Sequence, residues 1–150
     1  QVPREASPVC VREVVEGVLK ERSHEIREKG IEVDVSGDLG TITASPTQIQ
    51  QVFSNLIGNA INYNDSENPV IRISHLGDDG DGGHRYLVRD NGPGIPEDII
   101  DNVFLPFIKG KSGDTGIGLS MAQKIVKVYG GEIRAYNEGG ACLEFVLRDF

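Results

Sequence analysis

The spacing of apolar residues changes several times along this chain, between the period of a helix and that of a strand. Apolar residues that recur three and four positions apart predict three long helices and one short helix. Ser45-Pro46 fits the N-cap and first turn of the second helix, and Gly30 is the kind of residue that ends the first. The predicted helices cover about residues 9–29, the segment from Pro46 onward, a short stretch after Pro96, and about 116–129.

Short runs of β-branched and aromatic residues, several alternating with polar residues, predict strands between these helices. The runs cover residues 31–36, 41–44, 69–76, 84–90, 132–137 and 142–149. Helices and strands interleave without an obvious linker or internal repeat. The sequence therefore predicts a single α/β domain, folded as a two-layer α/β sandwich with a mixed sheet of about five strands and about three main helices.

Composition narrows the class of protein. The chain has 150 residues, 38% of them hydrophobic, which is enough for one buried core and too short for two independent domains. No apolar run approaches the ~20 residues of a membrane span, and the start has no signal-peptide pattern, so we expect a soluble, cytoplasmic fragment without direct membrane contact. A net charge of -8 argues against a nucleic-acid partner, but it allows a nucleotide held by local lysines and backbone amides. Cys10 and Cys142 form no cluster of metal ligands, so structural zinc is not expected.

Three asparagines form a polar stripe on the second predicted helix. Asn55, Asn59 and Asn62 are spaced i, i+4, i+7, which places them on one face, while the apolar residues of the helix gather on another. Asparagine is a mediocre helix former, so this face costs some local stability. Taken alone, the stripe fits either a solvated surface or a binding site.

Two glycine-containing segments are candidate nucleotide sites. Residues 90–94 (DNGPG) follow a predicted strand, and they form either a simple turn or a place where a flat ring approaches the backbone. In the second case, the aspartate would accept a hydrogen bond from an exocyclic amine such as that of adenine. Residues 109–119 (KGKSGDTGIGL) run into a helix, whose free N-terminal amides can bind phosphate. This second segment lacks the residue order of a P-loop and of a dinucleotide-binding fold.

Taken in order, these segments resemble the GHKL superfamily of ATP-binding domains, and within it the catalytic, ATP-binding domain of bacterial-type sensor histidine kinases. QVFSNLIGNAINY is similar to the family's N box, DNGPGIP to its first glycine box, VFLPF to its F box, and GDTGIGLSMAQKIVKVYGG to its second glycine box with the helix that follows. Several motifs in the family's order are more specific than any one alone, and they span nearly the whole chain. The resemblance implies the Bergerat fold, with ATP and Mg²⁺ as ligands.

The resemblance also implies roles for individual residues. Asn59 would bind a magnesium ion that bridges the phosphates, and Asp90 would accept a hydrogen bond from the adenine amine. Asn55 and Lys111 are the candidate catalytic residues, and both would also contact the nucleotide. The other implied nucleotide-binding residues are Tyr63, Gly92, Gly94, Ile95 and Leu119 around the base, and Lys109, Thr115, Gly116 and Gly118 around the phosphates.

Asn55 favours a kinase over a hydrolase. In hydrolytic members of the superfamily, such as gyrase-type topoisomerases, a glutamate at this position activates water, whereas the amide of Asn55 cannot act as a general base. The resemblance then implies transfer of the γ-phosphoryl group to a histidine on a separate dimerisation domain, which in turn serves a response regulator, and an isolated domain that is a monomer. A GHKL-type hydrolase, a serine protein kinase and a non-catalytic nucleotide-binding module remain as alternatives.

The chain departs from the family's pattern near the expected phosphates. Asn62 stands where many members have lysine or arginine, and Asp114 replaces a common glycine just before Thr115. The lysine-containing loop is also short. Lys111 aligns better than Lys109 with the motif of some histidine kinases, so it is the preferred phosphate contact.

His24 lies in a segment similar to a phosphoacceptor box, in which an acidic and a basic residue follow a histidine. Only about 30 residues separate it from Asn55, which leaves no room for the second helix of the family's acceptor hairpin. The proline of the motif is absent, and His24 is expected on the side of its helix opposite the valine stripe. We therefore interpret His24 as an exposed residue and not as the acceptor.

Overall fold

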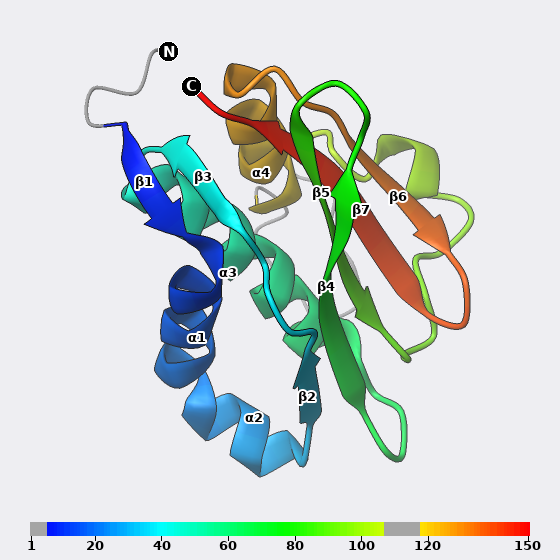
Figure 1. Cartoon of the computed structure of the whole chain (residues 1–150). Coiled ribbons are helices and arrows are strands. Elements are labelled where there is room, and N and C mark those ends of the chain that lie inside the picture. Colours follow the sequence, from blue (N-terminus) through cyan, green and yellow to red (C-terminus); the bar gives the residue numbers. More distant parts are fainter. Residues whose placement is uncertain (1–5, 107–117) are drawn as a thin grey trace.

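The computed structural model describes residues 6–106 and 118–150, which form a main sheet, a helical layer and a small second sheet (Figure 1). The main sheet has five strands in the order β2–β4–β5–β7–β6. β2 runs parallel to β4 and the other neighbours are antiparallel, so the sheet is mixed, as predicted. Its strands are β2 (Glu32–Val35), β4 (Val70–Asp78), β5 (Gly83–Asp90), β7 (Ala141–Arg148) and β6 (Ile133–Asn137).

The helical layer packs against one face of this sheet (Figure 1). Its central helix, α3, contacts α1 and α4 as well as strands β4 and β5. Side chains alternate across a strand, so Ile71 and Ile73 of β4 are buried under the helices while Arg72 between them is exposed. The helices are α1 (Val11–Glu21), α2 (Ser23–Lys29), α3 (Pro46–Tyr63), α4 (Gly118–Val128) and the 3-10 helix η1 (Ile100–Asn102). The predicted two-layer α/β sandwich is confirmed.

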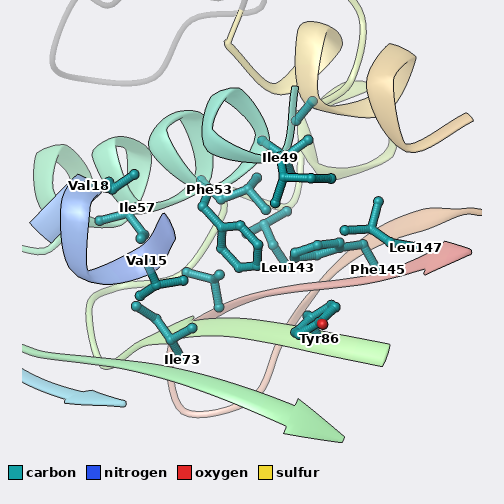
Figure 2. Close-up of a cluster of buried hydrophobic side chains, with 14 of the residues drawn as sticks. Val15, Val18, Ile49, Phe53, Ile57, Ile73, Tyr86, Leu143, Phe145 and Leu147 are labelled. Carbon is teal, nitrogen blue, oxygen red and sulfur yellow. The ribbon is translucent and has the colours of Figure 1, made fainter. Parts of the chain in front are cut away.

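Three aromatic rings mark the centre of the core between the two layers (Figure 2). Phe53 of α3 meets Tyr86 of β5 and Phe145 of β7 edge to face, with ring centroids 5.6 and 5.4 Å apart. The Tyr86 hydroxyl donates a hydrogen bond of 2.7 Å to the backbone oxygen of Leu39, so its polar end is satisfied despite burial. Full burial of a large apolar side chain stabilises the fold by about 1.5–3 kcal/mol, and this cluster therefore fixes α3 firmly over the sheet.

The prediction of one continuous first helix is wrong at both its start and its middle. Its first residues instead form a strand, β1 (Ser7–Cys10), which pairs antiparallel with β3 (Thr41–Ala44) in a separate two-stranded sheet. The helix proper begins at Val11 and breaks at Arg22, whose φ of -102° and ψ of 15° interrupt the helical path. At this break the Arg22 guanidinium donates hydrogen bonds of 3.2 Å to both the backbone oxygen and the hydroxyl of Ser54 on α3. Tertiary contacts thus override a continuous helical pattern.

Other predicted elements agree closely with the structure. Gly30 ends α2 in the left-handed conformation, with φ of 64°. The short helix expected after Pro96 is the 3-10 helix η1, preceded by a turn in which the N–H groups of Ile99 and Ile100 bond to the Pro96 oxygen. No helix in the described ranges has the length and apolar character that crossing a membrane requires.

Candidate functional site

Helix α3 presents two faces of different chemistry, as the sequence predicts. Asn55, Asn59 and Asn62 are half-buried, and so is Tyr63 at the last position of the helix. The opposite side of α3 lies in the core, and this burial determines which face of the helix is exposed. The buried residues are Ile49, Val52, Phe53, Leu56, Ile57, Gly58, Ala60 and Ile61.

Asp90 is a buried carboxylate at the end of β5, with 6% of its surface exposed. Its Oδ1 atom accepts hydrogen bonds from the backbone N–H groups of Gly92, at 2.8 Å, and Ala141, at 3.2 Å. Burial raises the pKa of Asp90 above its ordinary value, and the two backbone hydrogen bonds oppose this effect. Among the described residues no hydrogen bond reaches Oδ2, so the second oxygen remains an acceptor for a ligand.

The glycines after Asp90 allow a close approach of several backbone segments. A Cβ atom at Gly92 would lie 3.1 Å from the Cα of Asn64 and 3.2 Å from the backbone oxygen of Tyr63. Gly94 has φ of 85°, a conformation that other residues rarely adopt, and a Cβ there would lie 2.7 Å from the side-chain oxygen of Asn137. The first glycine segment is therefore packed directly against the end of α3.

A network of side-chain amides joins these two segments. The Nδ2 atom of Asn64 donates to Asn91 Oδ1 at 2.9 Å, and the same oxygen accepts from the Val70 backbone N–H at 2.8 Å. Asn91 Nδ2 donates to the backbone oxygen of Asn68, and the Ser66 hydroxyl donates to Asn64 Oδ1. The buried amide of Asn64 thus fixes the exit of α3 relative to Asp90.

Helix α4 packs against α3. It starts at Gly118, and the next residue, Leu119, is 9% exposed and part of the core. Its far end is fixed to the start of α3, because the Tyr129 hydroxyl donates to Gln48 Oε1 at 2.6 Å and accepts from the Ser45 N–H at 2.9 Å. Ser45 stands at the N-cap position of α3, but its side chain makes no capping bond.

Several predicted site residues fall outside the described ranges. They are Lys109, Lys111, Thr115 and Gly116, together with Asp114, which departs from the family's pattern. Their predicted phosphate contacts stay predictions. Of the predicted residues after this segment, Gly118 is the first residue of α4 and Leu119 is the second.

The donor set on α3 fits a cation that is also bound by phosphate. In residues 6–106 and 118–150 no group of three or more histidine, cysteine, aspartate or glutamate side chains could hold a metal ion. The Asn59 amide offers one neutral oxygen, which Mg²⁺ accepts when phosphate and water oxygens complete its coordination. A magnesium ion at this face would therefore bind together with a nucleotide and not before it.

His24 lies on the surface of the protein. It is on α2, its side chain is 77% exposed, and its Nε2 atom is 3.5 Å from a Glu28 carboxylate oxygen one turn later. The exposure predicted from the sequence is confirmed.

Sequence reasoning missed the amides that support the site. Asn64, Asn91 and Asn137 hold the glycine segment through hydrogen bonds, yet none was singled out. The position of Asn91 inside the DNGPG motif was the available signal. Asn64 and Asn137 gave none, because their partners are distant in sequence and only the fold brings them together.

The chain belongs to the histidine kinase-, DNA gyrase B- and HSP90-like ATPase family, whose sequence model matches residues 44–149. Its fold is that of a histidine kinase catalytic domain. It matches the catalytic domain of the histidine kinase ThkA with a TM-score of 0.82 and 32% identity, covering 97% of this chain and 96% of that one. It also matches full-length ShkA in complex with AMPPNP, with a TM-score of 0.82 and 27% identity over 98% of this chain and 31% of that one. The structure of ThkA in complex with the response regulator TrrA is similar as well, with a TM-score of 0.78, 28% identity and coverage of 97% of this chain and 42% of that one.

Within this family, the relatives of the chain include sensor histidine kinases. The histidine-protein kinase AfsQ2 of Streptomyces coelicolor is 40% identical over 126 residues, which cover 77% of this chain and 22% of that protein. Cyanobacterial phytochrome B of a Nostoc species is 37% identical over 147 residues, which cover 93% of this chain and 19% of that protein. The chain thus spans about a fifth of the length of these relatives.

Proposed function

We propose that this chain binds Mg-ATP and donates the γ-phosphoryl group to a histidine on a separate dimerisation domain, in two-component signal transduction. The observation that carries the proposal is the arrangement of Asp90. One carboxylate oxygen is held by the N–H groups of Gly92 and Ala141, and the other has no donor among the described residues. A buried acceptor beside two glycines suits the exocyclic amine and flat face of adenine.

The adenine would lie against the first glycine segment, on the side where Asp90, Tyr63 and Ile95 could contact it. Asp90 would accept from its amine, and Gly92 and Gly94 would let the ring approach the backbone. Tyr63, Ile95 and Leu119 would line the base pocket. The half-buried position of Tyr63 and Ile95, and the core position of Leu119, support this assignment.

The phosphates would extend along the asparagine face of α3 toward the start of α4. Asn59 would bind magnesium, which neutralises phosphate charge when it is bound. Asn55 would contact the nucleotide without activating water, because an amide is not a general base. We assign the remaining phosphate contacts to Lys111, Lys109, Thr115, Gly116 and Gly118, with Lys111 preferred over Lys109.

The acceptor histidine would come from a separate domain. We do not assign this role to His24, which is exposed on α2 beside Glu28. The dimerisation domain would then pass the phosphoryl group to a response regulator, and the complex of ThkA with TrrA supports a partner of this kind. We expect this chain alone to be a monomer that acts in the cytoplasm, including where the parent protein is membrane-anchored.

Calorimetric titration of ATP into the chain tests the proposal. We expect a single site with magnesium present, weaker binding when the magnesium is chelated, and no steady release of phosphate. An Asn59→Ala variant should lose most of the effect of magnesium on affinity. Absence of ATP binding would refute the proposal, and steady hydrolysis would favour a hydrolase of the same family.

A further inference from the structure

We propose that Asn137 is a positioning residue for the nucleotide, because its side-chain amide fixes the backbone of Ile95 at the end of the glycine segment. Asn137 Oδ1 accepts from the Ile95 N–H at 2.8 Å, and Asn137 Nδ2 donates to the Ile95 oxygen at 2.9 Å. The inference deepens the proposed function and rests on it, since Ile95 is placed beside the base.

The two hydrogen bonds between Asn137 and Ile95 resemble those between neighbouring strands. A side-chain amide carries one donor group and one acceptor, as a peptide unit does, so it can form the two hydrogen bonds that a neighbouring strand would form. Asn137 is the last residue of β6, which lies at the edge of the main sheet. Its side chain therefore extends the pairing of the sheet to the segment that contains Ile95.

The β6–β7 hairpin holds the glycine segment at both ends. At one end, the Ala141 N–H bonds to Asp90, and Gly140 approaches so closely that a Cβ there would lie 1.9 Å from the Asp90 backbone oxygen. At the other end, Asn137 holds Ile95. The hairpin thus sets the path of the chain between Asp90 and Ile95, including both glycines beside the base.

Loss of the Asn137 amide would loosen one end of this path. Gly94 has φ of 85° and no Cβ to restrict it. Without the two hydrogen bonds between Asn137 and Ile95, which we call the clamp, the segment would therefore sample other conformations. The apparent Kd is inversely proportional to the fraction of molecules in the binding-competent conformation. We expect Asn137→Ala to weaken ATP binding by about tenfold.

The test compares wild type with Asn137→Ala by calorimetry with Mg-ATP and by hydrogen exchange without nucleotide. Asn137 is exposed, so the variant should keep the wild-type melting temperature within a few degrees. Its Ile95 amide should exchange faster than in wild type, a result that a general loss of packing would not confine to one segment. Asn137→Ser has a shorter side chain with a single polar atom in place of two, so it should fall between wild type and Asn137→Ala. Glu138→Ala, in the same hairpin, alters only a side chain outside the clamp and should behave as wild type.

Two outcomes would overturn the inference. Wild-type affinity in Asn137→Ala would remove Asn137 from positioning, and unchanged protection of the Ile95 amide would show that any loss of affinity has another cause. The two arms also separate this inference from the proposed function. Failure of wild type to bind ATP refutes the function, whereas the exchange of the Ile95 amide in the nucleotide-free protein reports on the clamp itself.

Discussion

At the scale of single residues, the burial of the Asp90 carboxylate costs the fold stability. A carboxylate that is 6% exposed loses its hydration, and only two backbone N–H groups compensate it among the described residues. A residue selected for stability alone would be neutral at this place. The cost is reasonable when a bound nucleotide supplies the missing hydrogen-bond donor.

We expect Asp90→Asn to bind ATP at least roughly tenfold more weakly than wild type, as measured by calorimetry. The substitution places a donor group where the adenine amine needs an acceptor, and a hydrogen bond to a charged group contributes about 1.5–3 kcal/mol. Asp34→Asn is the matched control, because Asp34 is 61% exposed on β2 and only 3.8 Å from one arginine nitrogen. Equal affinity of folded Asp90→Asn and wild type would exclude Asp90 from the site.

The same substitution should not destabilise the nucleotide-free protein at neutral pH. Because the folded-state pKa of Asp90 is raised, the stability contributed by its protonated form is present below the ordinary value of 3.8 and is lost as pH rises through the folded-state pKa. Asparagine never ionises and can keep the Oδ1 hydrogen bonds. The melting temperature of Asp90→Asn should therefore equal or exceed that of wild type at about pH 7, with a smaller difference near pH 4. A large loss of stability at neutral pH would contradict this account.

At the scale of elements, the sequence predicts the features that follow from the spacing of apolar residues. It does not predict the features that depend on contacts between residues distant in the chain. The asparagine and apolar faces of α3 follow from spacing alone, and the structure confirms them. The break at Arg22 does not follow from spacing, because it depends on Ser54, which is 32 residues away. The pairing of β1 with β3 is missed for the same reason.

The junction of α1 and α2 can be tested through Gly58 of α3. A Cβ at Gly58 would lie 2.7 Å from the Arg22 guanidinium, so Gly58→Ala should displace Arg22 from Ser54. In an Arg22→Ala background this conflict is absent, and the change should stabilise the protein by up to about 1 kcal/mol through helix propensity. Urea unfolding of both single variants and of the double variant measures the coupling. An identical effect of Gly58→Ala in the two backgrounds would show that Arg22 does not occupy the space beside Gly58.

At the scale of the whole molecule, the fold brings together motifs that are separated along the sequence. The N-box segment on α3, the first glycine segment after β5 and helix α4 are far apart in the chain, yet α4 packs against α3 and Gly92 lies against Asn64 at the end of α3. Motif order could predict this assembly, since each motif carries its own chemistry. Two of the supporting amides, Asn64 and Asn137, could not be predicted, because each is an ordinary asparagine until the fold supplies its partner.

The division of labour between this chain and a separate acceptor is the central claim. In-line transfer requires the acceptor nitrogen to reach the γ-phosphoryl group, and His24 is an exposed residue of α2 paired with Glu28. Labelled ATP should therefore leave the isolated chain unlabelled, and addition of the matching dimerisation domain should produce acid-labile phosphate on that partner. Acid-labile label on the isolated chain that disappears in His24→Gln would contradict the account, as would a partner that stays unlabelled while the chain binds Mg-ATP.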